Sequence, residues 1–380
     1  MLLVLSEEQR LLAKAAADFV AASDSLKRLR KLRDTGAPRA YSPELFAQMA
    51  ELGWTAIPFS EADGGAGLGL AEVAVLLEAL GRGLVPEPYL STVMLGGSAL
   101  ALGGTETQKR ALLPDIIAGT KLSTLAYQER GSRYELSHVA TRAERAGSAY
   151  RLSGEKIQVL DGQAADLFVI SARSSGGQAE RSGITLFLVP RDAPGLSITP
   201  QQRIDSRGAA LVALDGVELD EASVLGGVGE GYSLLERVID RAMVAISAEM
   251  LGTMSAAFEQ TLDYLKSRVQ FGVAIGSFQA LKHRAARMFI EVELARSLVM
   301  AAARASDEGL PEARLLSSAA KARCSDALML VANEAIQMHG GIGMTDEHDI
   351  GFFLKRARVA ELTFGDAAFH RQRFAELSGF

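Results

Sequence analysis

The chain has 380 residues, 48% of them hydrophobic, which is enough for two or three domains with a sizeable core. Its formal net charge of −6 excludes a global basic field that would attract nucleic acid or an anionic membrane. A single cysteine, Cys324, excludes an intrachain disulfide framework and suits a reducing compartment. No basic segment precedes the short apolar run at the N-terminus, so we predict no signal peptide and expect a cytoplasmic protein.

The first third of the chain has the apolar periodicity of helices. Ser6 is suited to cap the first of them, because its hydroxyl can accept from free backbone amides. We predict helices over residues 6–20, 42–52, 70–80, 90–102 and 105–118. The basic stretch 27–39 is predicted to be flexible. The uncharged stretch 88–105 approaches the roughly 18 to 20 residues of a membrane span, but its glycine pairs and hydroxyl side chains favour a buried helix.

After Gly119 the apolar residues alternate with polar ones, which is the period of β-strands. We predict strands over residues 122–127, 138–144, 150–159, 167–173, 184–189 and 211–219. Because no helices separate them, they indicate a sandwich or barrel and exclude a doubly wound sheet. The polar segment 174–182 is predicted to be a disordered hairpin loop.

From residue 229 onward the pattern is helical again, with apolar stripes over residues 234–246, 281–303, 315–338 and 359–374 that predict an antiparallel bundle. Gly272 and Gly276 interrupt this pattern, so two helices should meet there at a tight elbow. An elbow with Arg268 and Phe271 would suit a planar, anionic ligand, with guanidinium on phosphate and ring against ring. The residues alone favour a corner whose Arg is solvated and whose Phe is in the core.

The motif Arg268-x-x-Phe271-Gly272, followed by Phe278-Gln279, resembles the segment by which acyl-CoA dehydrogenases reach the FAD of a neighbouring subunit. The resemblance extends from Ser6 to the C-terminus. Residues 129–135 and 362–366 are most similar to the small subunit of pimeloyl-CoA dehydrogenase. The resemblance implies an α+β fold with an N-terminal helical domain (1–119), a middle β-sandwich or barrel domain (120–225) and a C-terminal four-helix bundle (226–380).

The resemblance also implies which residues contact FAD. At the adenosine and pyrophosphate end the pattern of residues 337–345 matches closely, whereas at the isoalloxazine end Gln158 and Leu160 stand where relatives have Trp and Thr. Neither offers an indole face or a hydroxyl donor. The implied cofactor-binding residues are Arg268, Phe271, Gln279, Gln337, Gly340, Gly341, Tyr127 and Gln128.

The implied reaction removes two hydrogens from adjacent carbons of an acyl-CoA, with a carboxylate taking the proton alpha to the thioester while hydride leaves the beta carbon for the flavin. Aligning Gly365 with the glycine of the usual Tyr-Glu-Gly-Thr motif puts Phe364 where the catalytic Glu stands. The second location used by some relatives holds Ala242. Asp366 is the candidate base, and its alternative role is to cap the helix over residues 367–377. Glu361 is a weaker candidate that would instead pair with an arginine such as Arg358.

Two functions follow from this resemblance. The chain is either an FAD-dependent acyl-CoA dehydrogenase with Asp366 as base, or a non-catalytic structural subunit of a hetero-oligomer whose large subunit supplies the Glu. In both, the substrate is an acyl-CoA and FAD lies at a subunit interface of a homo-oligomer or hetero-oligomer. Electrons pass to an electron-transfer flavoprotein or a similar acceptor, with oxygen as an alternative. The five histidines are not spaced as metal ligands, and neither nucleic acid nor a membrane span is expected.

Overall fold

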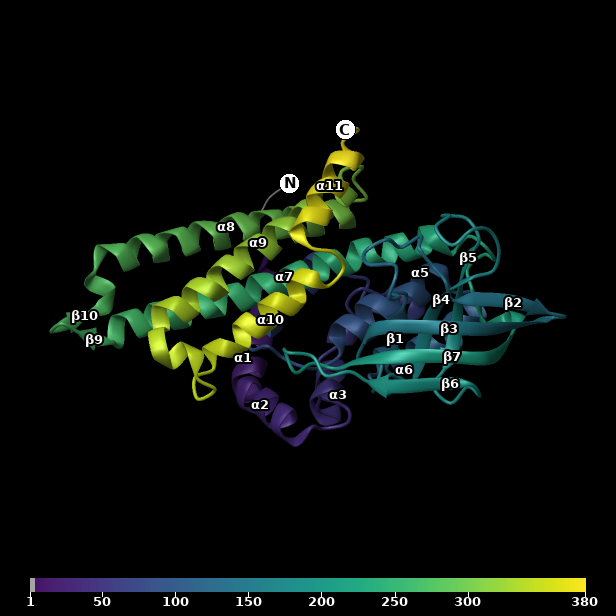
Figure 1. The fold of residues 1–380 in the computed structure, drawn as a ribbon, viewed down its shortest axis with the longest axis horizontal. Coiled ribbons are helices and arrows are strands. Elements are labelled where there is room, and N and C mark those ends of the chain that lie inside the picture. The colour runs from purple at the N-terminus through teal and green to yellow at the C-terminus, as the bar shows by residue number, and fades with distance from the viewer. Residues whose placement is uncertain (1–3) are drawn as a thin grey trace. The chain divides into compact units, whose positions relative to one another are not determined.

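The computed structural model describes residues 4–380. These residues form two compact units, each assembled from segments that are not contiguous in the sequence (Figure 1). The bundle unit comprises the chain up to Lys31, Gly69–Val85 and Met243–Phe380. The sheet unit comprises Leu32–Leu68 and Pro86–Ala242.

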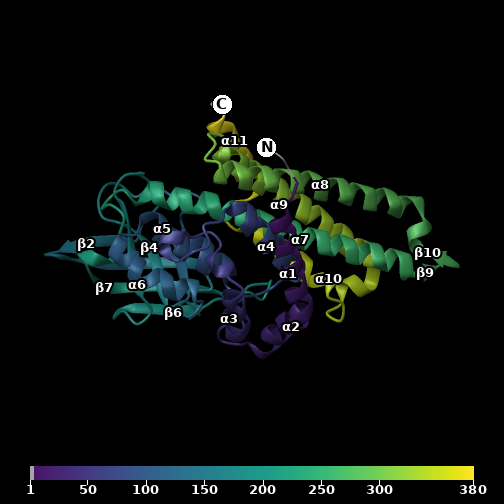
Figure 2. The ribbon, with the colours of Figure 1, turned by 180° about the vertical axis from the view of Figure 1, so that it is seen from behind.

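Long helices build the bundle unit. They are α1 (Glu7–Ala22), α4 (Leu70–Arg82), α8 (Gln279–Asp307), α9 (Ala313–His339), α10 (Ile350–Leu362), α11 (Ala367–Leu377) and most of α7 (Gly231–Ser267). Helix α9 packs against α8, α10 and α11 (Figure 2). The predicted cap of α1 is confirmed: Ser6 Oγ accepts from the amide of Gln9, and Gln9 Oε1 accepts from the amide of Ser6. This reciprocal pair satisfies two amides that the first turn leaves without partners.

The basic stretch 27–39 is not a flexible linker. Its first part belongs to helix α2 (Ser25–Thr35). Leu26, Leu29 and Leu32 recur every three residues, and Leu29 is buried. A leucine stripe at this spacing gives a helix one apolar face although most of its other residues are charged. The prediction gave weight to the charges and missed the stripe.

The sheet unit contains short helices and one hydrogen-bonded network of strands. The helices are α3 (Pro43–Glu51), the π-helix η3 (Leu90–Gly97), α5 (Ser98–Gly103) and α6 (Glu106–Ile117). The strands are β1 (Ser123–Ala126), β2 (Arg142–Ala146), β3 (Ala149–Leu160), β4 (Leu167–Arg173), β5 (Ile184–Pro190), β6 (Leu196–Pro200), β7 (Ala209–Asp220) and β8 (Val224–Leu225). The order is β6-β7-β3-β2-β4-β5-β8, with β1 parallel to β4. Strands β6 and β8 were not predicted, because they are short and β6 is largely exposed.

The segment 88–105 is the buried helix that the sequence predicts, divided between η3 and α5. Its glycines permit close packing, since a Cβ on Gly96 would come within 2.5 Å of Ser123 Oγ. Over residues 4–380, none of the helices combines the length and the apolar character needed to cross a bilayer.

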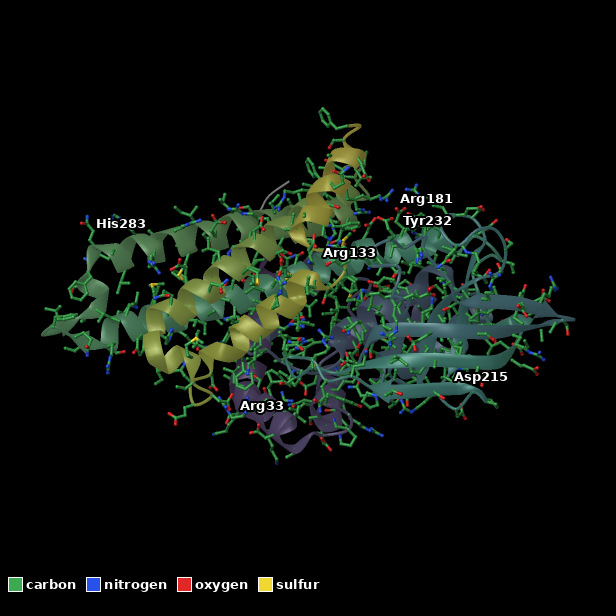
Figure 3. The ribbon with its side chains drawn as sticks, viewed as in Figure 1. Arg33, Arg133, Arg181, Asp215, Tyr232 and His283 are labelled. Carbon is green, nitrogen blue, oxygen red and sulfur yellow. The ribbon has the colours of Figure 1, made fainter. Side chains whose placement is uncertain are left out.

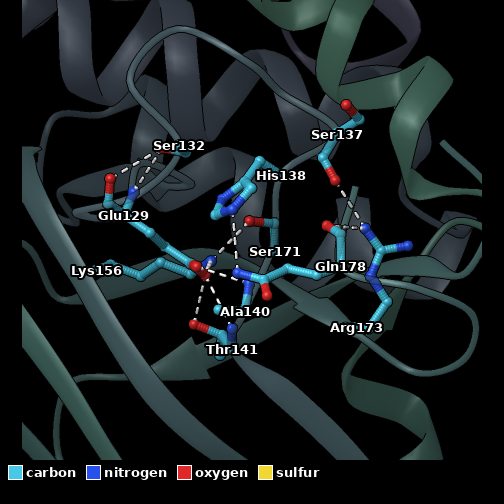
Figure 4. A network of polar contacts seen from close by, with 10 residues as sticks. All are labelled: Glu129, Ser132, Ser137, His138, Ala140, Thr141, Lys156, Ser171, Arg173 and Gln178. Atoms are coloured by element: carbon cyan, nitrogen blue, oxygen red, sulfur yellow. Dashed lines mark hydrogen bonds and ion pairs between the residues drawn. The ribbon is translucent and has the colours of Figure 1, made fainter. Parts of the chain in front are cut away.

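The loop 174–182 is ordered, which corrects the prediction of disorder. The guanidinium of Arg173 donates to the carbonyl oxygens of Ser137 at 2.7 Å and Gln178 at 2.9 Å (Figure 4). It also donates to the carbonyl oxygen of Ser182 at 2.6 Å. Arg181 lies over the ring of Tyr232, 5.2 Å from its centre (Figure 3). Arg173 and the contact between Arg181 and Tyr232 therefore hold this polar loop in place, and the sequence pattern predicts neither interaction.

The elbow predicted between two helices is present, but it contains a small hairpin. Helix α7 ends at Ser267, and β9 (Val269–Gln270) pairs with β10 (Val273–Ala274) before α8 begins at Gln279. The hairpin turns at Phe271 and Gly272, whose φ angles are 53° and 78°. Two consecutive positive φ angles define the type I′ turn that suits a two-residue hairpin.

Candidate functional site

The elbow presents its functional side chains to solvent. The ring of Phe271 is 92% exposed, and it meets Phe278 edge to face with 6.2 Å between the ring centres. Arg268 and Gln279 are also exposed. A core position for the phenylalanine, the alternative favoured by the residues alone, is therefore wrong. An exposed aromatic pair beside a guanidinium is unusual for a surface that stays uncovered.

The glycine corner lies at the end of α9, where Gln337, Gly340 and Gly341 are exposed. Gly340 has φ 65° and ψ −140°, a conformation open essentially to glycine alone. Apart from the chain neighbours of each glycine and the local helix backbone, no described heavy atom lies within 4 Å of where a Cβ on Gly340 or Gly341 would stand. The backbone here is accessible to an incoming group, as a phosphate-contacting corner requires.

An aromatic contact joins the elbow to the glycine corner. Tyr264 stacks on His339 with 4.5 Å between ring centres, and its carbonyl oxygen accepts from the amide of Arg268. Burial lowers the pKa of His339, so its ring is neutral. Its Nδ1 then donates to the carbonyl oxygen of Ala335 at 2.7 Å. Two motifs about seventy residues apart in sequence are thereby positioned by the same pair of rings.

The position expected for the base lies in the turn between α10 and α11. Phe364 occupies it with φ 62° and is buried. The next carboxylate, Asp366, is the N-cap of α11 and accepts from the amide of Phe369 at 2.9 Å, which confirms its predicted capping role. Glu361 forms an ion pair with Arg358, as its alternative predicted. Ala242 is buried in α7.

Tyr127 and Gln128 belong to the sheet unit, directly after β1. The carbonyl oxygen of Gln128 accepts from the amide of Ile157 at 2.8 Å, so this segment adjoins Gln158 in β3. Gln158 has φ 53°. Burial raises the pKa of Tyr127, so its phenol stays protonated.

A buried ion pair supports these two segments. Lys156 Nζ lies 2.6 Å from Glu129 Oε1, and it donates to Ser171 at 3.0 Å (Figure 4). The same carboxylate accepts from the amides of Ala140 and Thr141 and from the Thr141 hydroxyl. Burial lowers the pKa of Lys156 to about 8, against the attraction of Glu129. The strand period in the sequence indicates that Lys156 is buried, although the sequence analysis did not use it. Lys156 lies on the same strand face as the apolar residues Tyr150 and Leu152.

Backbone strain recurs at the candidate site residues. Gln158, Phe271 and Phe364 are three non-glycine residues with positive φ, which is uncommon and, for phenylalanine, a clear outlier. Each costs on the order of 1–3 kcal/mol and persists only where the surroundings impose it. Such positions are enriched at active sites and ligand clamps. Six other described non-glycine residues also have positive φ, so these angles accompany the three segments without by themselves identifying a site.

Family models cover most of the chain. The acyl-CoA dehydrogenase N-terminal domain matches residues 6–120, the middle domain residues 124–217 and the C-terminal domain residues 229–378. The chain therefore belongs to the acyl-CoA dehydrogenase family. It is an oxidoreductase with FAD as its cofactor, and the predicted fold of helical, β and helical domains is confirmed.

Individual proteins agree with the family models. The chain is 31% identical over 372 residues to a probable acyl-CoA dehydrogenase, YngJ, of Bacillus subtilis, covering 97% of each sequence. Butyryl-CoA dehydrogenase from Megasphaera elsdenii superposes with a TM-score of 0.92 at 26% identity, covering 99% of each chain. A chain of the ChsE4–ChsE5 complex from Mycobacterium tuberculosis superposes with a TM-score of 0.90 at 26% identity and full coverage of both.

The residues present fit one end of FAD better than the other. At the adenosine end, the exposed Arg268, the exposed Phe271 ring and the open backbone at Gly340 and Gly341 suit a pyrophosphate and a purine. At the isoalloxazine end, the side chain of Gln158 lacks an aromatic face, and its backbone N–H donates to Oε1 of Gln201. The elbow and the glycine corner therefore fit the nucleotide part of FAD, whereas Gln158 does not supply the aromatic face expected at the isoalloxazine ring.

Proposed function

We propose that this chain is the small subunit of an FAD-dependent acyl-CoA dehydrogenase, and that a related large subunit supplies the catalytic carboxylate. The observation that carries this proposal is Phe364, which is buried at the position expected for the base, while Asp366 is engaged as a helix cap. The exposed elbow supports it, because Arg268 and Phe271 form half of a nucleotide site that a neighbouring chain would complete. The two-protein ChsE4–ChsE5 complex shows that a similar fold occurs beside a second protein.

In this proposal the chain binds and orients the FAD nucleotide, and it excludes water from the site. Arg268 would neutralise the pyrophosphate, Phe271 would stack on the adenine, and Gly340 and Gly341 would let backbone amides approach. Bound FAD supplies the acceptor for the hydride that leaves the beta carbon of the acyl chain. The buried Phe364 would contribute an apolar wall, and a dry site strengthens every hydrogen bond to the thioester oxygen.

A second version keeps the catalysis in this chain, with Asp366 as base. The position of Asp366 favours this version, because Asp366 directly follows Phe364 and Gly365 in the turn where the base is expected. The carboxylate that caps α11 through one oxygen would take the alpha proton, and the same hydrogen bond would hold it in place.

An electron-transfer flavoprotein is the proposed acceptor in either version, and a dicarboxyl acyl-CoA such as pimeloyl-CoA is the first substrate to try.

The test compares the chain alone with the chain co-expressed with a longer family member from the neighbouring reading frame. We expect the chain alone to be colourless or to bind flavin weakly, and the co-purified oligomer to be yellow and bleached anaerobically by acyl-CoA. Asp366→Asn, which keeps the cap, should leave bleaching unchanged, whereas Arg268→Met should lower the flavin content of the oligomer. A yellow, active homo-oligomer from the chain alone would reject the small-subunit role.

A further inference from the structure

The turn between α10 and α11 has positive φ angles at two successive residues, of which only the non-glycine one is strained. Phe364 has φ 62° and Gly365 has φ 116°. A Cβ on Gly365 would stand 2.5 Å from the ring of Phe369 and 2.7 Å from Nε2 of His370, so no other residue fits without displacement. A phenylalanine in the left-handed region persists only when neighbouring groups fix it there. The question is which groups do so.

Lys321, from α9, is the first of these groups. Its side chain is fully buried, and Nζ donates to the carbonyl oxygen of Gly365 at 2.8 Å and to that of Glu361 at 2.9 Å. Its third neighbour is Ser325 Oγ at 3.0 Å. Burial lowers the pKa of Lys321 to about 7. A neutral amine still donates to both carbonyls while its lone pair accepts from the serine hydroxyl, so the contacts hold in either protonation state.

His370, from the first turns of α11, is the second. Its ring is fully buried, and Nε2 lies 3.0 Å from the carbonyl oxygen of Phe364. Burial, followed by the charges of Lys321 and Arg373, lowers the pKa of His370 to about 3. The ring is therefore neutral, with its proton on Nε2. Two successive carbonyl groups, those of Phe364 and Gly365, are held by side chains from two different helices.

We propose that Lys321 and His370 are positioning residues for the reaction. They fix the Phe364 turn so that the phenyl ring and the first turn of α11 form a rigid wall of the acyl-CoA site. This inference rests on the proposed function, in which Phe364 contributes an apolar wall to the site that holds the thioester. Neither side chain touches the reacting atoms in this scheme. A wall displaced by about 1 Å would misalign the bound acyl chain and cost on the order of a hundredfold in rate.

The experiment uses the flavin-loaded oligomer and three variants. Lys321→Met removes both donors to the turn at similar length, His370→Phe removes the donor to Phe364, and Ser325→Ala removes a partner of Lys321 that does not touch the turn. We expect about tenfold or greater slowing of anaerobic flavin reduction by acyl-CoA for the first two, with unchanged flavin content, and wild-type rates for Ser325→Ala. Hydrogen exchange over residues 359–370 should accelerate in the same two variants only.

Wild-type reduction rates and exchange in Lys321→Met and His370→Phe would overturn the inference. If wild-type flavin is not reduced by any acyl-CoA, the proposed function fails, yet the exchange comparison still decides whether the two side chains hold the turn. If Lys321→Met does not fold, His370→Phe and Lys321→Gln, which retains one donor group, carry the same comparison. An intermediate rate for Lys321→Gln supports the inference, and a wild-type rate in His370→Phe with unchanged exchange contradicts it.

Discussion

At the scale of single residues, the sheet unit retains a buried charge pair because every polar atom of the carboxylate has a partner. Glu129 accepts from Lys156, Thr141 and Ala140, and it is almost inaccessible to solvent. Removing one member of such a pair leaves an uncompensated charge. We expect Lys156→Met to lower the free energy of unfolding by about 3–5 kcal/mol, measured by urea denaturation. The double variant Lys156→Met with Glu129→Gln should recover part of this loss, and equal losses in both would contradict the pairing argument.

Protonation of His370 makes the free energy of unfolding depend on pH. Its pKa is about 3 in the folded chain against an ordinary 6.5, so the unfolded chain binds the extra proton first as pH falls. The stabilisation is complete above pH 6.5 and declines between 6.5 and 3 with a slope of up to about 1.4 kcal/mol per pH unit. Denaturation curves of wild type and His370→Phe, recorded from pH 7 to 4, should differ in this slope. Parallel curves would show that another group controls acid unfolding.

At the scale of elements, α11 separates the two roles open to Asp366. The carboxylate accepts from the amide of Phe369, and an asparagine would accept the same bond. Asp366→Ala should destabilise the chain by about 1 kcal/mol, whereas Asp366→Asn should be close to wild type in thermal unfolding. If Asp366 were the base, both variants would abolish flavin bleaching, so stability and activity distinguish a cap from a catalyst.

At the scale of the whole molecule, the exposed elbow predicts that cofactor binding needs an assembly. Phe271 is 92% exposed in the chain and contributes little to its folding. Phe271→Ala should leave the unfolding of the isolated chain unchanged and lower the flavin content of the oligomer, measured by visible absorption after gel filtration. Phe380, 95% exposed at the C-terminus, provides the control, and Phe380→Ala should retain full flavin. Equal flavin in both variants would contradict a role for the elbow ring.

Local patterns determined much of the secondary structure. Ser6, Thr105 and Asp366 begin helices where their side chains accept from free amides, and period-two alternation located the longer strands. Helix α2 was missed because charge outweighed its leucine stripe, and β6 because its alternation of Leu196 and Ile198 with polar residues is confined to a strand of five residues. The domain limits near residues 119 and 225 and the individual FAD contacts stay predictions.

The sequence by itself determined the family, the order of helices and strands, and the absence of a carboxylate at position 364, because these depend on residue type and spacing. Only the tertiary structure showed that Tyr264 and His339 join the elbow to the glycine corner, and that Lys321 and His370 hold the Phe364 turn. The first of these contacts joins two helices, and the others join a helix to the turn between α10 and α11. Tertiary packing decides which carbonyl oxygen accepts from a buried amine or imidazole. The periodicity of the sequence does not predict which one it is.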